Sequence, residues 1–454
     1  MIHGAKKIIV IGGNAAGPAA AAKAKRVNPD AEVLLFEAGN FISTGTCELP
    51  YLLSGEINDY KKIVFFDPDS FYKSKGVEVF LNHRVEEINR TQKFVVARNL
   101  TDQKVSHYSY DSLILATGSK AKIFSGLSQL PDNAFNLKSV QDYLAIKNYL
   151  DNNTVKDVVI VGAGYIGLET AEAFSKLDKK VTVIEKDILP LPGYEVEVRN
   201  LIKDLLQKNE IDFIPESGSP RFSKNQKRIE SITVNGRLIK TDLVLFATGV
   251  EPNNSLAVSS RLKTGEWGGI VVDSYLRTDD NSVYAAGDVI EVQERISGKN
   301  IYLPLATLAH AQGHIAGANA AGQRIKTESV IRNIAVKIFD KVSARVGINS
   351  EELDAAHRNY DSVTAVVPNL VKVMPKSENI FGKLLFDKSS GVIFGAEFFG
   401  NNEVTGYADL ISTLLYKRGV VQDLGKINFN YTPPSSPFVN ILSVLGRKAE
   451  EKII

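Results

Sequence analysis

A glycine-rich turn between an apolar strand and a helix constrains the fold of this chain more than any other feature. Residues 158–185 are VVIVGAGYIGLETAEAFSKLDKKVTVIE, with Gly162, Gly164 and Gly167 at the G-x-G-x-x-G spacing. The first glycine of such a turn allows the tight bend, the second lets backbone approach a pyrophosphate, and the third lets the helix pack on the strand. Glu185 ends the next strand 18 residues after Gly167, where its carboxylate is placed to bind ribose hydroxyls. The segment therefore predicts a Rossmann-type dinucleotide site, with the phosphates at the helix N-terminus.

The same order of strand, turn, helix, strand and acid occurs a second time, in residues 8–37. Gly12 and Gly17 hold the outer glycine positions, but Asn14 occupies the middle one, and Glu37 follows Gly17 by 20 residues. This duplication predicts a second, less regular nucleotide site. Two dinucleotide sites in one chain imply two cofactors, most economically a flavin and the nicotinamide that reduces it.

Glu185, the acidic residue of the complete G-x-G-x-x-G site, affects whether NADH or NADPH binds there. A carboxylate at Glu185 would repel a 2′-phosphate, which favours NADH over NADPH. Lys186 stands beside it, so NADPH remains possible.

The order of the remaining segments predicts how the domains are arranged. Two similar strand-and-turn segments, DSLILATGS and DLVLFATGV, follow the two units, and NSVYAAGDV comes later. We expect a helix from Leu305 to about Ala320, then short strands (334–339, 363–367 and 383–386) and a helix near 408–418. The predicted class is α/β, with two Rossmann-like domains, one inserted in the other, and a C-terminal α+β domain. The boundaries are 1–118 with 248–326, 119–247, and 327–454.

Composition excludes several classes of protein. Lys+Arg 54 against Asp+Glu 52 leaves a net charge of +2, which argues against a nucleic-acid binder. No apolar run approaches the ~18 residues that cross a bilayer. The run Ile8–Ile11 is too short for a signal peptide and the following Ala-rich stretch carries Lys23, Lys25 and Arg26. A single cysteine excludes an intramolecular disulfide, a CxxC pair and a cysteine-cluster metal site, so we expect no metal and a cytoplasmic location.

The lone cysteine, Cys47, lies in FISTGTCELPYLLSGEI. The small polar residues followed by ELPYLL indicate a helix start with Thr46 as its cap, and the helix dipole there would favour the reactive thiolate. The like charge of Glu48 opposes that effect. Taken alone, the residues favour a small buried hydrophobic side chain, the commonest role of a free cysteine.

Together these motifs resemble the single-cysteine branch of the pyridine nucleotide-disulfide oxidoreductase family, and the pattern is closest to coenzyme A-disulfide reductase. The resemblance covers both βαβ units, ATGS, ATGVEPN, AAGD and the stretch from Ser43 to Tyr51. The branch also contains coenzyme A persulfide and polysulfide reductases, NADH oxidases and NADH peroxidases. The resemblance implies FAD in the first site, NAD(P)H in the second, and a C-terminal domain that forms a homodimer.

The resemblance also assigns roles to single residues. Cys47 would be the redox-active residue beside the flavin, Tyr165 the aromatic side chain that screens the flavin, and Glu169 a group near the nicotinamide. Asp288 would lie near the ribityl chain, and Ala306 with Thr307 near the flavin ring. The full set of expected cofactor-binding residues is Gly12, Asn14, Ala15, Ala16, Gly17, Glu37, Ala116, Thr117, Gly118, Asp288, Ala306, Gly162, Gly164, Tyr165, Ile166, Gly167, Glu169, Glu185 and Gly249.

A coenzyme A site is implied by a third group of residues. Those that match the branch's substrate contacts are Lys23, Arg26, Ser43, Thr46 and Lys75. Tyr431 resembles the catalytic tyrosine that reaches the partner subunit's cysteine. On charge pattern alone, the basic residues of the first helix form a solvated face instead.

Several positions depart from the branch. Thr46 stands where the branch usually has an asparagine, and Glu48 stands where it has a small residue. Met374, just before Pro375, stands where the branch has its second interfacial tyrosine. His310 and His314 replace the usual Asn and Arg. These changes leave open whether the substrate is coenzyme A disulfide, a coenzyme A persulfide, polysulfide or another small thiol compound.

We therefore predict an enzyme that oxidises NAD(P)H and reduces a small disulfide or persulfide through a mixed disulfide at Cys47. One alternative is an NADH peroxidase or oxidase in which Cys47 cycles through sulfenic acid. Such enzymes carry a histidine in the first glycine turn, where this chain has Asn14 and alanines. A flavin redox sensor and an electron transferase are further alternatives. The ferredoxin-reductase relatives of the fold lack the cysteine segment.

Overall fold

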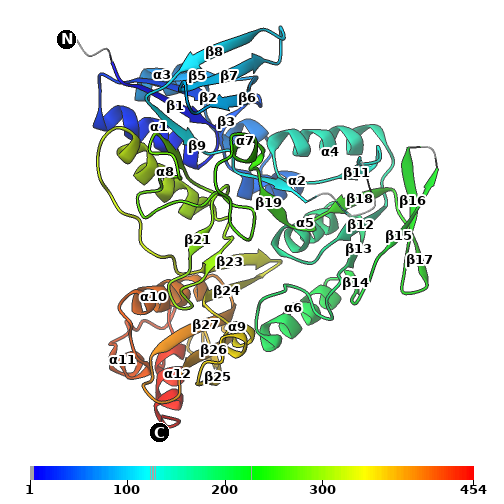
Figure 1. Cartoon of the computed structure of the whole chain (residues 1–454). Coiled ribbons are helices and arrows are strands. Elements are labelled where there is room, and N and C mark those ends of the chain that lie inside the picture. The colour runs from blue at the N-terminus through cyan, green and yellow to red at the C-terminus, as the bar shows by residue number, and fades with distance from the viewer. Residues whose placement is uncertain (1–4, 123, 125–126, 128, 226, 454) are drawn as a thin grey trace.

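The computed structural model describes residues 5–122, 124, 127, 129–225 and 227–453. Its first unit is built on a five-stranded parallel sheet with the strand order β20-β9-β1-β2-β5. These strands are β1 (Lys7–Ile11), β2 (Glu32–Phe36), β5 (Glu78–Phe80), β9 (Ser112–Leu115) and β20 (Val283–Ala285). All four residues of β9 are buried, as in a parallel sheet covered on both faces. Because β20 follows the second unit in sequence, the first unit consists of two separate stretches of chain (Figure 1).

The second unit repeats this architecture around a parallel sheet with the order β11-β18-β12-β13-β14. Its strands are β11 (Ala134–Phe135), β12 (Asp157–Val161), β13 (Lys180–Ile184), β14 (Asp212–Ile214) and β18 (Leu243–Phe246), and its helices are α4 (Val140–Asn152), α5 (Tyr165–Lys176) and α6 (Val196–Lys208). The chain enters and leaves this unit through an antiparallel pair, β10 (Ser119–Ala121) with β19 (Val250–Pro252). The two parallel sheets confirm the predicted α/β class.

The third unit is an antiparallel sheet with helices, as expected for an α+β domain. Its strand order is β23-β24-β27-β26-β25, and it lies below the other two units in Figure 1. The elements are β23 (Asn333–Ile338), β24 (Lys341–Gly347), α9 (Ser350–Ala355), β25 (Tyr360–Pro368), β26 (Asn379–Asp387), β27 (Ile393–Gly400), α10 (Val404–Tyr416), α11 (Val421–Lys426) and α12 (Ile441–Glu450). The helix expected near 408–418 is α10, which begins four residues earlier.

Helices α1 (Ala16–Val27) and α8 (Ala306–Ala320) pack closely because small residues line their contact. A Cβ added at Gly313 would lie 2.2 Å from the carbonyl oxygen of Ala16. A Cβ added at Gly317 would lie 2.1 Å from the carbonyl oxygen of Ala20. The expected helix from Leu305 to about Ala320 is α8. This close packing brings the N-termini of both helices to the same end of the first sheet, beside Gly287.

The other described elements are short and surround the two parallel sheets. They are β3 (Ile42–Thr44), η1 (Thr46–Glu48), α2 (Leu49–Leu53), η2 (Tyr60–Ile63), β4 (Val64–Phe66), α3 (Pro68–Lys75), β6 (His83–Asn89), β7 (Phe94–Asn99), β8 (Val105–Ser109), β15 (Arg221–Asn225), β16 (Arg228–Val234), β17 (Arg237–Lys240), α7 (Ser255–Ser259), β21 (Val292–Gln293) and β22 (Asn300–Ile301). Among the described residues, no helix combines the length and the apolar character that crossing a membrane requires.

Candidate active site

The first glycine turn has the geometry that a dinucleotide site needs. Gly12 follows β1 with a φ of +111°, and a Cβ there would lie 2.0 Å from the carbonyl oxygen of Ala116. A Cβ at Gly17 would lie 1.8 Å from the carbonyl oxygen of Gly12. Glu37, at the end of β2, accepts a hydrogen bond of 2.7 Å from the backbone N–H of Gly13. Only glycine therefore fits the two outer positions, and the acid is held against the turn.

The second turn reproduces these contacts. Gly162 has a φ of +107°, and its added Cβ would lie 2.5 Å from the carbonyl oxygen of Ala247. Glu185 accepts a hydrogen bond of 2.7 Å from the backbone N–H of Ala163. No atom lies within 4 Å of a Cβ added at Gly164, so the backbone faces open space there. Both turns can approach a pyrophosphate, and the residues present fit two dinucleotides.

Asn14, at the middle glycine position of the first turn, contacts the segment that carries the cysteine. Its side-chain oxygen accepts a hydrogen bond of 3.0 Å from the backbone N–H of Thr44 and one of 3.3 Å from the Thr44 hydroxyl. Its backbone is not in the left-handed region, so the position does not require glycine. Thr44 ends β3, three residues before Cys47. This contact joins residues 30 positions apart, which no local pattern indicates.

A cavity of about 760 Å³ extends from the first turn to the cysteine. Its lining includes the expected cofactor-binding residues Gly12, Asn14, Ala15, Ala16, Glu37, Ala116, Thr117, Gly118, Asp288 and Ala306, together with Thr46 and Cys47. Gly17 lies behind the turn, where its contact with Gly12 positions α1. The structure thus brings the residues predicted for the first site together around one cavity.

Lys138 lines the same cavity and was missed by the sequence reasoning. Its ammonium nitrogen lies 3.6 Å from a carboxylate oxygen of Asp288, which also accepts a hydrogen bond of 2.8 Å from the Ser119 hydroxyl. Because Lys138 and Asp288 are far apart in sequence, only the folded chain reveals the pair. It places a positive charge in the cavity near Cys47.

A second cavity, of about 740 Å³, also has Cys47 in its lining. Four of the five expected substrate residues line it, namely Arg26, Ser43, Thr46 and Lys75. The fifth, Lys23, acts electrostatically on His314, which lines this cavity with His310. The side chains of Phe65, Phe66 and Phe71 supply apolar surface. Because Cys47 lines both cavities, the residue lies at their junction.

The local structure at Cys47 corrects three expectations. Thr46 does not cap a helix, because it is the first residue of the 3₁₀ turn η1, and no side chain caps either η1 or α2. The five residues of α2 begin after Cys47, and the pKa of the thiol is raised instead of lowered as the helix dipole would predict. The expectation from residues alone of a small buried hydrophobic side chain is also wrong, because Cys47 is exposed.

The surroundings raise the pKa of the Cys47 thiol. Although the side chain reaches solvent, protein surrounds the sulfur on several sides. Loss of solvent raises the pKa most, the charges of Glu48 and Glu169 raise it further, and Lys138 acts in the opposite direction. The influence expected from Glu48 is therefore present and is joined by that of a second acid from α5.

Residues expected at the nicotinamide lie at the start of α5. Burial, and then the charge of Glu172, raise the pKa of Glu169 to about 7. Glu169 also lines a small pocket with Pro50 and Tyr51, which places it beside the cysteine segment. The ring of Tyr165 packs edge-on against that of Tyr194, with centroids 6.1 Å apart. Ile166 and Gly167 follow in the same helix, and Gly249 follows β18 with a φ of +96°.

Tyr431 lies in the third unit, between α11 and α12, with 48% of its surface exposed. Its ring packs edge-on against Phe438, which is 78% exposed. Tyr431 is not among the residues that line the two cavities at Cys47 of the same chain. Met374, half-buried, lies in the connection between β25 and β26. Met374 is likewise absent from the lining of both cavities.

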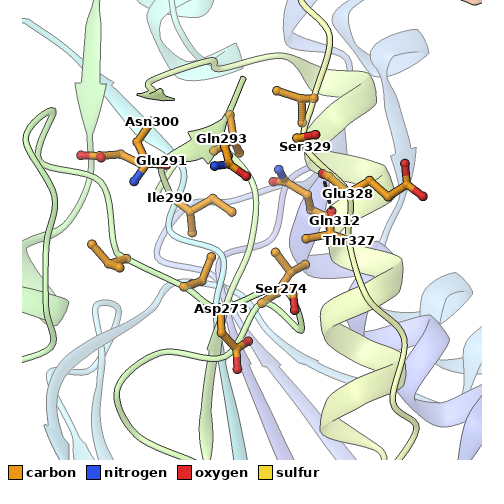
Figure 2. A pocket seen from close by; sticks show the side chains of 15 residues that line it. Asp273, Ser274, Ile290, Glu291, Gln293, Asn300, Gln312, Thr327, Glu328 and Ser329 are labelled. Carbon is orange, nitrogen blue, oxygen red and sulfur yellow. Dashed lines mark hydrogen bonds between the residues drawn. The ribbon is translucent and has the colours of Figure 1, made fainter. Parts of the chain in front are cut away.

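A third cavity, of about 280 Å³, lies between α8 and the β21–β22 hairpin (Figure 2). Its lining carries Asp273, Glu291 and Glu328, and it shares no lining residue with the two cavities at Cys47. Within the described residues, no group of three or more His, Cys, Asp or Glu side chains is arranged to hold a metal ion.

Comparisons with known proteins extend over the whole chain. A family model described as pyridine nucleotide-disulphide oxidoreductase matches residues 6–313. The NAD(P)H sulfur oxidoreductase (CoA-dependent) of Pyrococcus abyssi is 31% identical over 445 residues, covering 97% of this chain and 98% of the relative. The crystal structure of reduced Bacillus anthracis CoADR-RHD is similar with a TM-score of 0.94 and 27% identity, over 99% of this chain and 81% of that one. A NAD-dependent persulfide reductase from A. fulgidus is similar with a TM-score of 0.93 and 31% identity, over 98% and 83% of the two chains.

Proposed function

The chain belongs to the pyridine nucleotide-disulphide oxidoreductase family, and from that premise we propose that it reduces a small disulfide or persulfide with electrons from NAD(P)H through Cys47. The position of Cys47 at the junction of two cavities carries this proposal. One cavity contains the glycine turn of a dinucleotide site, and the other contains basic and aromatic side chains. A thiol at that junction can exchange electrons with a cofactor on one side and a substrate on the other.

The first cavity fits FAD. Its glycine turn leaves room for a pyrophosphate, α1 presents its N-terminus there, and Asp288 stands where a polar chain of the cofactor would lie. Bound FAD would accept a hydride from NAD(P)H and supply two electrons at Cys47. The Lys138 ammonium near Cys47 would stabilise negative charge on the sulfur.

The second turn is proposed to bind NADH in preference to NADPH. The Glu185 carboxylate is held against the turn by the N–H of Ala163 and would repel a 2′-phosphate. Tyr165 lies at the first position of α5 and would cover the flavin until the nicotinamide displaces its ring. Glu169, one turn later, would contact the nicotinamide.

The thiol chemistry uses one sulfur of the chain and two of the substrate. The Cys47 thiolate attacks a substrate disulfide, forming a mixed disulfide and releasing the first thiolate product. Two electrons then break the mixed disulfide, which restores Cys47 and releases the second product. The balance is RSSR + NADH + H⁺ → 2 RSH + NAD⁺. A raised thiol pKa makes any positive charge beside the sulfur, such as that of Lys138, important for forming the thiolate.

The second cavity is proposed to bind coenzyme A as the disulfide or the persulfide. It places Cys47 and Ser43 among the same lining residues as Arg26 and Lys75, so a ligand with a sulfur at one end and phosphates at the other fits its chemistry. The relative from Pyrococcus abyssi is CoA-dependent by name, which supports this choice.

We further propose a cytoplasmic homodimer with the three domains at the predicted boundaries. Exposed apolar side chains at Tyr431, Phe438 and Val439 of the third unit offer a subunit contact. In an isologous dimer each active site would receive Tyr431 of the partner subunit. Its hydroxyl could donate a proton to the leaving thiolate.

Anaerobic oxidation of NADH by the FAD-loaded protein tests the function. Coenzyme A disulfide, polysulfide and hydrogen peroxide would be compared as oxidants, with Cys47→Ser and, as a matched control on the nearby helix α3, Ser74→Ala. We expect turnover with a sulfur oxidant that Cys47→Ser abolishes and Ser74→Ala retains. Turnover with peroxide alone would establish the competing peroxidase function, and undiminished activity in Cys47→Ser would remove the cysteine from the chemistry.

A further inference from the structure

Two histidines lie one helical turn apart on α8, at the wall of the second cavity. His310 and His314 both line it, and their ring centroids are 4.7 Å apart. The positions i and i+4 place both side chains on the same face of the helix. They share the cavity with Arg26 and Lys75, so four side chains that can carry positive charge meet there.

The elements around His310 and His314 each contribute charged side chains. Helix α1 contributes Lys23 and Arg26, which act on His314 together with His310. Helix α3 contributes Lys75, whose ammonium lies 5.7 Å from the centre of the Phe66 ring. The acidic residue of the cavity lining is Glu48, in η1 beside Cys47. The histidines are therefore surrounded mainly by positive charge.

This environment opposes protonation of His314 in the free protein. Loss of solvent and then the charges of His310, Arg26 and Lys23 lower the pKa of His314. An anion bound among these groups would offset the positive charges and favour the protonated imidazole. By linkage, binding of the anion and uptake of a proton strengthen each other.

We propose that His310 and His314 form a proton-linked subsite for an anionic, phosphate-bearing part of the substrate. The inference rests on the proposed function, because it places the phosphates of a coenzyme A compound in the second cavity. Permanent cations at the same positions would hold a phosphate at any pH. A histidine that gains a proton on binding instead makes affinity increase as the pH falls, and His314 is placed to do so. The cavity of Figure 2 offers a contrast, because its lining contains acids and no Lys, Arg or His.

Calorimetry with S-methyl-coenzyme A tests the subsite, because this ligand carries the phosphates but cannot form a disulfide with Cys47. Titrations of the FAD-loaded protein in two buffers of different ionisation enthalpy, between pH 6 and 8, would give the affinity and the protons taken up. The variants are His310→Asn/His314→Asn and His314→Arg, the second of which keeps a permanent positive charge. S-methyl-pantetheine, which lacks phosphate, is the control ligand and corrects for contacts made by the rest of the molecule.

We expect the native protein to take up more protons than the double variant and to bind about tenfold more tightly at pH 6. The His314→Arg variant should keep the affinity and lose most of the proton uptake. Equal proton uptake and affinity in the native protein and the double variant would overturn the subsite while leaving the coenzyme A site intact. An absence of binding in every variant would overturn the coenzyme A site itself.

Discussion

The side-chain oxygen of Asn14 accepts a hydrogen bond of 3.0 Å from the backbone N–H of Thr44, joining the first glycine turn to the segment that carries Cys47. A glycine at this position would complete the glycine motif but could not make the contact. We therefore expect Asn14 to position Cys47 through its contact with Thr44 at the end of β3.

The Asn14→Gly variant should loosen the cysteine segment with only a small loss of global stability, about 1 kcal/mol for one partly exposed hydrogen bond. We expect a change in the rate of Cys47 alkylation by iodoacetamide and a lower kcat with the sulfur substrate. The Asn14→Asp variant keeps an acceptor oxygen and serves as the control. If Asn14→Gly alkylates and turns over like the native protein, the contact has no role in positioning Cys47.

The pKa of Cys47 gives a second prediction. Burial together with Glu48 and Glu169 raises this pKa, so removing the negative charge of Glu48 should lower it. Alkylation rates of the Glu48→Gln variant should reach their plateau at a lower pH than those of the native protein. Because Cys47 is the single cysteine of the chain, the alkylation signal has one source. A Glu48→Asp variant should behave like the native protein, and an unchanged profile in Glu48→Gln would contradict the electrostatic argument.

Local patterns predicted the parts of the site that are local in sequence. Each glycine turn lies between a strand and a helix, and its acid follows at the end of the next strand, so spacing alone indicated both Glu37 and Glu185. The contact between Asn14 and Thr44 and the pair of Lys138 with Asp288 depend on how distant segments pack. No period or motif encodes such contacts.

The error at Thr46 has a similar cause. A small polar residue before an apolar run is typical of a helix cap, but the chain here forms a 3₁₀ turn first. The expected lowering of the Cys47 pKa is outweighed, because loss of solvent and Glu169, an acid from α5, raise it. Burial and distant charges of this kind follow from tertiary packing.

Glu169 gives a third prediction, on pH dependence. Burial raises its pKa to about 7, so it is protonated below that pH and ionised above it. Loss of a hydride leaves a positive charge on the nicotinamide, which an ionised Glu169 would stabilise. Reduction of the FAD-loaded protein by NADH, followed by stopped-flow absorbance, should therefore accelerate as the pH rises through about 7.

A neutral side chain at this position should remove the dependence, so Glu169→Gln should react at a rate that varies little across this range. The Glu172→Gln variant is the matched control on the same helix. Because Glu172 raises the pKa of Glu169, its loss should move the midpoint to lower pH without removing it. A native midpoint that persists in Glu169→Gln would assign the titration to another group.

The fourth prediction concerns a buried ion pair between the second and third units. The Lys383 ammonium lies 2.7 Å from a carboxylate oxygen of Glu195, and the two side chains are 8% and 4% exposed. Replacing one partner leaves the other as an uncompensated buried charge, which costs about 3–5 kcal/mol. The Lys383→Met variant should therefore unfold at a clearly lower urea concentration.

The control is the Lys147→Met variant, which breaks the exposed pair with Asp151 and should lower the free energy of unfolding by less than about 1 kcal/mol. Glu195→Gln/Lys383→Met should recover much of the loss, because neither charge then remains buried. If Lys383→Met and Lys147→Met unfold at the same urea concentration, the buried pair does not hold the two units together.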